Sequence, residues 1–136
     1  TIDKYMGDCI MAFWNAPIDC PDHAYKAVKT AVLIKKRLKE LNQENAFGHE
    51  IKIGIGINSG EALVGNMGSD QRFDYSVIGD AVNLASRLEG TSKNYDTTII
   101  IGEETVKRID KPKWAFRLVD KVQVKGKSEK VSIYTV

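Results

Sequence analysis

The chain has 136 residues, of which 43% are hydrophobic and 28% charged, and this composition fits one ordinary globular domain with its own core. A formal net charge of +2 gives no overall excess that would favour nucleic acid as a partner. No apolar run reaches the length of a membrane span, and no signal peptide is visible. The chain starts without Met inside a predicted strand, so we interpret it as part of a longer protein.

Two short strands are predicted at residues 1–5 and 9–14, and they meet at the turn Met6-Gly7-Asp8. A helix start follows at residues 19–22, because Asp19 or Asp22 can cap a helix and Pro21 is tolerated in a first turn. The helix itself is predicted from apolar residues at helical spacing, namely Ala24, Ala27, Val28, Ala31, Leu38 and Leu41. Its lysine-rich remainder is interpreted as a solvated outer face.

Isoleucines at alternate positions of residues 51–57 predict a strand with one apolar face. Gly54 and Gly56 leave the other face bare, so we expect another element to pack closely there. Ser59-Gly60 is expected to turn the chain into an adjacent partner strand over residues 61–66.

The run from Arg72 to Arg87 is predicted to enter as a strand and leave as a helix, which opens at Gly79-Asp80 with Asp80 as its cap and ends near Glu89. The remaining predicted elements are a strand at 97–101, a short helix at 103–109, and closing strands at 116–124 and 131–136. Strands outnumber helices and consecutive strands favour antiparallel pairing. The predicted class is therefore α+β, a mainly antiparallel sheet with helices packed on one face.

Asn83 and Arg87 lie four residues apart and therefore on one face of the predicted helix. An amide beside a permanent cation suits a phosphorylated ligand, because a guanidinium matches phosphate oxygens with forked donors. Taken alone, an arginine at the position of Arg87 more often forms a surface ion pair, here with Asp80 or Glu89. The residues by themselves leave both interpretations open.

Four stretches together resemble the catalytic domain of the class III nucleotidyl cyclases; they are Lys4–Asp8, Gly60–Ser69, Arg72–Arg87 and Val124–Lys127. The resemblance covers nearly the whole chain and implies a ferredoxin-like core. It implies that residues 1–136 are one partial catalytic domain that lacks the first strand and helices. The implied activity is that of an adenylate cyclase, a lyase that converts ATP to cyclic AMP and pyrophosphate by attack of the ribose 3′-hydroxyl on the α-phosphate. A guanylate cyclase and an inactive nucleotide-sensing dimerisation module are the alternatives.

The resemblance assigns base selection to Lys4 and Ser76. Lysine is a pure donor and suits the N1 acceptor of adenine, whereas guanine presents a donor there and requires an acceptor. A hydroxyl can accept a hydrogen bond from the 6-amino group of adenine. Because Ser76 lacks the methyl group of the threonine found in some adenylyl cyclases, we expect its hydroxyl to be placed less firmly.

The resemblance also implies phosphate and metal contacts. Asn83 would orient the ribose and Arg87 would stabilise the pentavalent transition state, where fixed donors aimed at developing charge contribute strongly. Lys125 matches a lysine that reaches the β- and γ-phosphates, and Arg72 is a weaker candidate for a phosphate contact. Asp8 matches one of two aspartates that bind two Mg²⁺ or Mn²⁺ ions per site.

In the family the active site lies between two catalytic domains. Because this chain holds both Asp8 and the base, ribose and phosphate residues, the resemblance implies a symmetric homodimer with the segment Glu61–Ser69 near the interface. The other implied partners are ATP and regulatory domains elsewhere in the parent chain, with no nucleic acid. A cytoplasmic domain is expected, whether or not the parent is anchored in a membrane. Residues 1–136 offer no second metal aspartate, so we expect them to be inactive alone.

Overall fold

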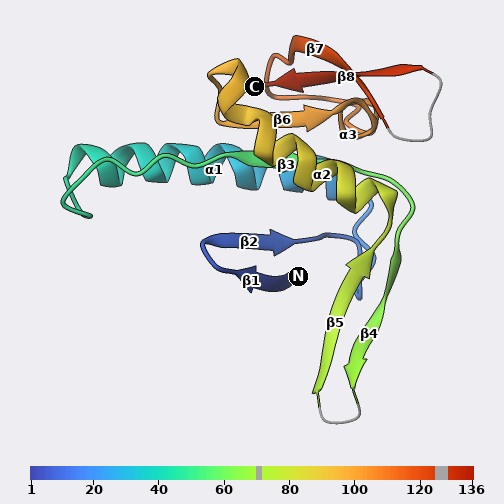
Figure 1. Ribbon diagram of the computed structural model, residues 1–136. Helices are drawn as coiled ribbons and strands as arrows, with labels where there is room; N and C mark the ends of the chain where they lie inside the picture. The colour runs from blue at the N-terminus through green and yellow to red at the C-terminus, as the bar shows by residue number, and fades with distance from the viewer. Residues whose placement is uncertain (70–71, 125–128) are drawn as a thin grey trace.

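The computed structural model describes residues 1–69, 72–124 and 129–136. Two antiparallel hairpins are formed by β1 (Ile2–Met6) with β2 (Cys9–Ala12), and by β4 (Leu63–Ser69) with β5 (Arg72–Ile78) (Figure 1). A four-stranded sheet has the order β3 (Ile55–Ile57), β6 (Ile99–Gly102), β8 (Lys130–Thr135) and β7 (Arg117–Gln123). The helices are α1 (His23–Gln43), α2 (Asp80–Thr91), the 3₁₀ helix η1 (Ser92–Tyr95) and α3 (Glu103–Lys107). Within the described ranges no helix is long and apolar enough to cross a membrane.

The four-stranded sheet confirms the predicted α+β class, since only β3 and β6 pair in parallel among its described strands. The predicted pairing of β3 with residues 61–66 is wrong, because β3 pairs with β6 and β4 pairs with β5. The observed strand β3 is also shorter than the strand predicted over residues 51–57. The side-chain amide of Asn42 bonds both backbone groups of Ile51, at 2.8 and 2.9 Å, and thereby takes the partners that a sheet ladder would supply.

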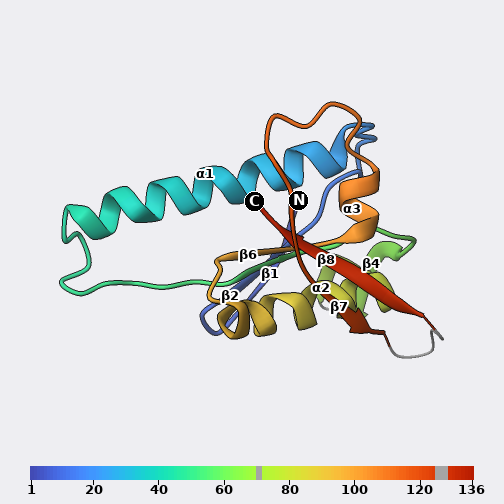
Figure 2. The same cartoon turned by 90° about the horizontal axis from the view of Figure 1, so that it is seen from above.

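The core lies on both faces of this sheet. Helix α1 buries Ala24, Ala27, Val28 and Ala31 against Ile57, Ile99 and Ile101, whereas α2 buries Leu88 against Ile100 and Ile133. Successive residues of a strand point to opposite faces, so the isoleucines of β6 alternate between the two helices. Figure 2 shows the sheet between α1 and α2. The prediction that the helices pack on one face is therefore wrong.

Gly54 and Gly56 lie where α2 and η1 approach the sheet most closely. A Cβ atom added at Gly56 would collide with backbone atoms of Ala85 and Glu89, and one at Gly54 would collide with the Ser92 hydroxyl. Only a residue without a side chain allows this approach. The predicted close packing on the bare face of this segment is confirmed.

The predicted helix caps are wrong in detail. Asp22 precedes α1 without capping it, because its carboxylate accepts the Cys20 thiol at 3.3 Å and pairs with Lys26 at 3.6 Å. The thiol contact is the largest cause of a lowered pKa for Asp22. Asp80 is the first residue of α2, and Gly79 precedes it at φ +152°, a conformation that favours glycine. A carboxylate in this first turn still favours the helix electrostatically.

Candidate functional site

Lys4 and Ser76, which are 72 positions apart in the sequence, meet through a residue that the sequence argument missed. Ser76 on β5 is 4% exposed, and its hydroxyl donates a hydrogen bond of 2.8 Å to Asp3 Oδ2. The backbone N–H of Val77 also points at Asp3 Oδ2, at 3.4 Å. Lys4 Nζ lies 3.9 Å from Asp3 Oδ1. The Asp3 carboxylate therefore links the two residues predicted to select a base.

A β-bulge delivers Asp3 to this position. Ile2 is opposite Ala12 and Lys4 is opposite Met11, so β1 advances two residues while β2 advances one. Asp3 is the extra residue, and bulges characteristically redirect a side chain. No periodicity in the sequence marks this bulge; the only local signal is an acidic residue next to Lys4.

Asp8 lies apart from this group, in the turn between β1 and β2, and is exposed. Gly7 before it has φ +60°, which glycine adopts at little cost. Asp8 lies beyond the end of β1, and the three strand residues between Asp3 and the turn span about 10 Å at the usual rise per residue. A carboxylate here fits as one ligand of a hard divalent cation that completes its shell with phosphate oxygens and water. The described part of the chain gathers no group of three or more His, Cys, Asp or Glu residues that could hold a metal.

Asn83 and Arg87 lie one turn apart on the exposed face of α2, as predicted. Arg87 Nη1 donates to the backbone carbonyl of Gln123 at 3.0 Å, which holds the guanidinium at the end of β7. The ion pair with Asp80 or Glu89 that the sequence left open is not formed among the described residues. The Arg87 guanidinium is thus positioned by a neutral carbonyl, which does not neutralise its positive charge.

Lys125 lies just beyond this point, outside the described residues. Arg72 begins β5, where its backbone is opposite Ser69 in the second hairpin. The roles predicted for both residues therefore remain predictions.

A second contact ties the end of α2 to β7. The Tyr95 hydroxyl, in η1, donates to Asp120 Oδ2 at 2.8 Å. This hydrogen bond is the main cause of a raised pKa for Tyr95 and a lowered pKa for Asp120. Together with the Arg87 contact it attaches the helix that carries Asn83 to the four-stranded sheet.

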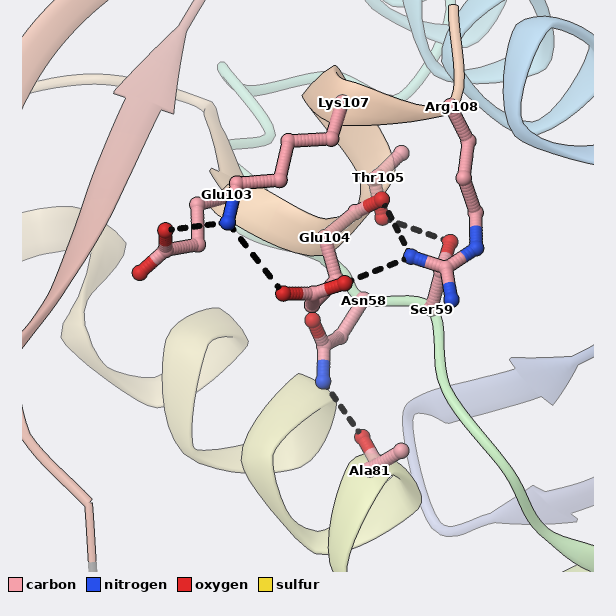
Figure 3. Close-up of polar contacts among 8 residues, drawn as sticks. All are labelled: Asn58, Ser59, Ala81, Glu103, Glu104, Thr105, Lys107 and Arg108. Carbon is pink, nitrogen blue, oxygen red and sulfur yellow. Dashed lines mark hydrogen bonds and ion pairs between the residues drawn. The ribbon is translucent and has the colours of Figure 1, made fainter. Parts of the chain in front are cut away.

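The start of α2 is held by the segment that follows β3 (Figure 3). Asn58 Nδ2 donates to the carbonyl of Ala81 at 3.0 Å, and the hydroxyls of Ser59 and Thr105 bond at 2.8 Å. This segment therefore connects the first turn of α2 to α3. The ion pairs along α3 are exposed and contribute little to stability (Glu103–Lys107, Glu104–Lys107 and Glu104–Arg108).

Large apolar side chains are exposed on the two hairpins. They are Ile2, Tyr5, Met6, Ile10, Leu63 and Ile78, and their exposed fractions range from 47% to 69%. A shallow hollow, lined by Glu61, Ala62, Leu63, Ile78 and Gly79, lies where β4 begins and β5 ends. Exposed apolar side chains of this size can contribute to an interaction site.

The chain matches the sequence profile of the adenylate and guanylate cyclase catalytic domain over residues 3–136. It is 43% identical to an adenylate cyclase of Anabaena cylindrica over 144 aligned positions, which cover 99% of this chain and 28% of that protein. Among solved structures, it is similar to the adenylyl cyclase CyaB from P. aeruginosa, with TM-score 0.82 and 38% identity over 98% of this chain and 69% of that one. It is also similar to the guanylate cyclase domain of RhGC from Catenaria anguillulae in complex with GTP, with TM-score 0.81 and 33% identity over the same shares.

Proposed function

Because the chain belongs to the adenylate and guanylate cyclase catalytic domain family, we propose that it forms the larger part of the catalytic domain of an adenylate cyclase. The reaction is the conversion of ATP to cyclic AMP and pyrophosphate. One observation carries the proposal beyond family membership: Lys4 and Ser76, a cation and a hydroxyl suited to an adenine edge, meet at one carboxylate although they are distant in the sequence. The chain spans 28% of the length of the Anabaena relative.

Base selection follows from hydrogen-bond polarity. The Lys4 ammonium can only donate, and it matches the N1 acceptor of adenine. The Ser76 hydroxyl has lone pairs that can accept from the 6-amino group. Guanine reverses the donor and acceptor at both positions, since it has N1–H in place of an acceptor and a carbonyl oxygen in place of the amino group. The pair therefore favours ATP over GTP.

The transition state is stabilised from α2 and from the phosphate-binding residues. Asn83 orients the ribose so that its 3′-oxygen lines up with the α-phosphorus, which converts a loose encounter into an oriented one. Arg87 places a fixed cation against the charge that develops on the phosphate. Lys125 and Arg72 add cations for the pyrophosphate that leaves.

Asp8 would hold a divalent ion, Mg²⁺ or Mn²⁺, because a carboxylate is the kind of ligand that these hard cations prefer. The metal, when bound, supplies Lewis-acid stabilisation of the phosphate and of the attacking oxygen. A centre with two ions needs a further carboxylate, which the described residues do not place beside Asp8.

Two copies of the chain complete the site. In one copy, the Asp8 turn is at the opposite end of the β1–β2 hairpin from the contact between Asp3 and Ser76. A symmetric partner can bring its own Asp8 to the nucleotide bound at Ser76, and the exposed apolar residues of the two hairpins supply a surface for that contact. The proposed assembly is a homodimer with two equivalent sites.

The test is product identification by chromatography and mass spectrometry, with ATP or GTP and Mg²⁺ or Mn²⁺, on the intact protein that carries this chain. Arg87→Ala should lower kcat by about 10²-fold or more, while Arg108→Ala, a matched loss of an exposed arginine directly after α3, should leave it unchanged. Cyclic GMP as the main product would identify a guanylate cyclase, for which the similarity to RhGC is the supporting observation. Nucleotide binding with neither product would identify an inactive sensing module.

A further inference from the structure

Asp3 is the most deeply buried charged side chain near the proposed base pocket. Its side chain is 1% exposed, and the buried Oδ1 atom has no hydrogen-bond partner among the described residues. Burying a carboxylate is costly unless it is well bonded, so a position like this calls for a reason beyond packing. Its contacts supply one, because they run to Ser76 and to Lys4.

We infer that Asp3 is a positioning residue for nucleotide specificity, which acts by fixing the polarity of the Ser76 hydroxyl. The inference rests on the proposed role of Ser76 in base selection. Asp3 itself does not touch the base, because its carboxylate is covered. Its effect reaches the ligand through Ser76.

A serine hydroxyl has one proton to donate and two lone pairs that accept, so a free serine serves adenine and guanine equally well. In this structure the proton of Ser76 is donated to Asp3 Oδ2 at 2.8 Å. A hydrogen bond to a charged group is stronger than one between neutral groups, so the proton is held there. Only the lone pairs of Ser76 are then left for a ligand.

This polarity distinguishes the two purines. The 6-amino group of adenine donates and finds an acceptor in Ser76, whereas the 6-carbonyl oxygen of guanine meets lone pairs and gains no bond. A site that leaves a polar group unpaired rejects the mismatched ligand far better than one that merely lacks a contact. Because Ser76 is 4% exposed, a ligand can contact only a small part of this residue.

A purely structural role for Asp3 makes a different prediction. If Asp3 only fastened β1 to β5, its loss would weaken ATP and GTP binding alike, and their ratio would not change. If Asp3 fixes the Ser76 proton, the loss of Asp3 frees that proton for the guanine carbonyl, and the preference for ATP over GTP falls.

The experiment measures ATP and GTP competition for a fluorescent nucleotide, with cyclic nucleotide formation alongside, on the intact protein that carries this chain. Asp3→Ala should lower the preference for ATP over GTP by about tenfold, the value of the one hydrogen bond that guanine gains from the freed Ser76 proton. Asp3→Leu fills the buried space and should do the same, which guards against a folding defect from the cavity. Asp3→Asn retains an oxygen that accepts from Ser76 and should keep the ratio of the parent.

Combining Asp3→Ala with Ser76→Ala tests whether Asp3 acts on nucleotide preference through the Ser76 hydroxyl. In that background the hydroxyl is gone, so Asp3→Ala should change the ATP to GTP ratio no further. An unchanged ratio in both Asp3→Ala and Asp3→Leu, with a parent that cyclises ATP, overturns the role of Asp3 and leaves the proposed function standing. A parent that binds neither nucleotide overturns both.

Discussion

Replacing Gly56 with alanine should move the helix that carries Asn83 and Arg87. The added Cβ would meet backbone atoms of α2, including Glu89 Cα at 2.9 Å, where ordinary contact begins at 3.4 Å. The difference, 3.4 − 2.9 = 0.5 Å, is the smallest retreat that relieves this contact, and the closer contacts with the Ala85 carbonyl and the Glu89 amide require more. Backbone cannot rotate away as a side chain does. We therefore expect a loss of about 1–3 kcal/mol of stability, the usual cost of overpacking.

The same movement should lower activity. A displacement near 1 Å of a catalytic group can reduce rate by about 10²-fold, and both Asn83 and Arg87 move with the helix. The matched control is Gly90→Ala in α2 itself, where the new Cβ meets nothing within 4 Å. That change should stabilise the protein by about 0.5–1 kcal/mol, because alanine favours a helix over glycine. Thermal unfolding and cyclic AMP formation measure both variants, and a Gly56→Ala protein with the melting temperature and rate of the parent would refute this account of the α2 contact.

Three further predictions concern the core, the surface contact of η1 and the metal. Leu88→Ala should destabilise the domain by about 2–5 kcal/mol, as measured by chemical denaturation, because this side chain is 1% exposed against β6 and β8. The folded pKa of Asp120 is lowered, so its hydrogen bond to Tyr95 stabilises the fold above the ordinary carboxyl pKa and is lost as the pH falls. The folded pKa of Tyr95 is raised, so the same hydrogen bond is also lost at strongly alkaline pH. The melting temperatures of Tyr95→Phe and the parent should thus differ most between about pH 5 and 9, and the difference should shrink as the pH falls below the ordinary carboxyl range. Asp8→Asn should raise the Mg²⁺ concentration for half-maximal activity about tenfold, whereas Asp19→Asn in an exposed loop should leave it unchanged.

Much of the fold could be predicted from local patterns. The helical spacing of residues 24–41, the glycines of residues 54–56 and the strand-to-helix run of residues 72–87 each led to an element that the structure contains. These features depend on neighbours a few residues away, which a sequence displays directly. The face shared by Asn83 and Arg87 follows from the same kind of local rule.

The features that were missed depend on distant partners. The parallel pairing of β3 with β6 places Ile55 opposite Ile99, and the sequence of neither strand indicates which strand it pairs with. Asp3 reaches Ser76 only because a bulge in β1 meets β5. The predicted helix cap failed for a different reason, because the Asp22 carboxylate bonds the nearby side chains of Cys20 and Lys26 and not the backbone of its own helix.

Strand β6 makes the two helical layers mechanically dependent on each other. Ile99, Ile100 and Ile101 are all fully inaccessible to solvent, and alternate residues belong to the clusters beneath α1 and α2. Neither cluster can open without exposing the strand that supports the other, so the domain should lose both in one cooperative step. The backbone amides of β6 should be the last to exchange their hydrogens with deuterium. A substitution in α1 that opens its own cluster would then also weaken the cluster beneath α2, the helix that carries Arg87.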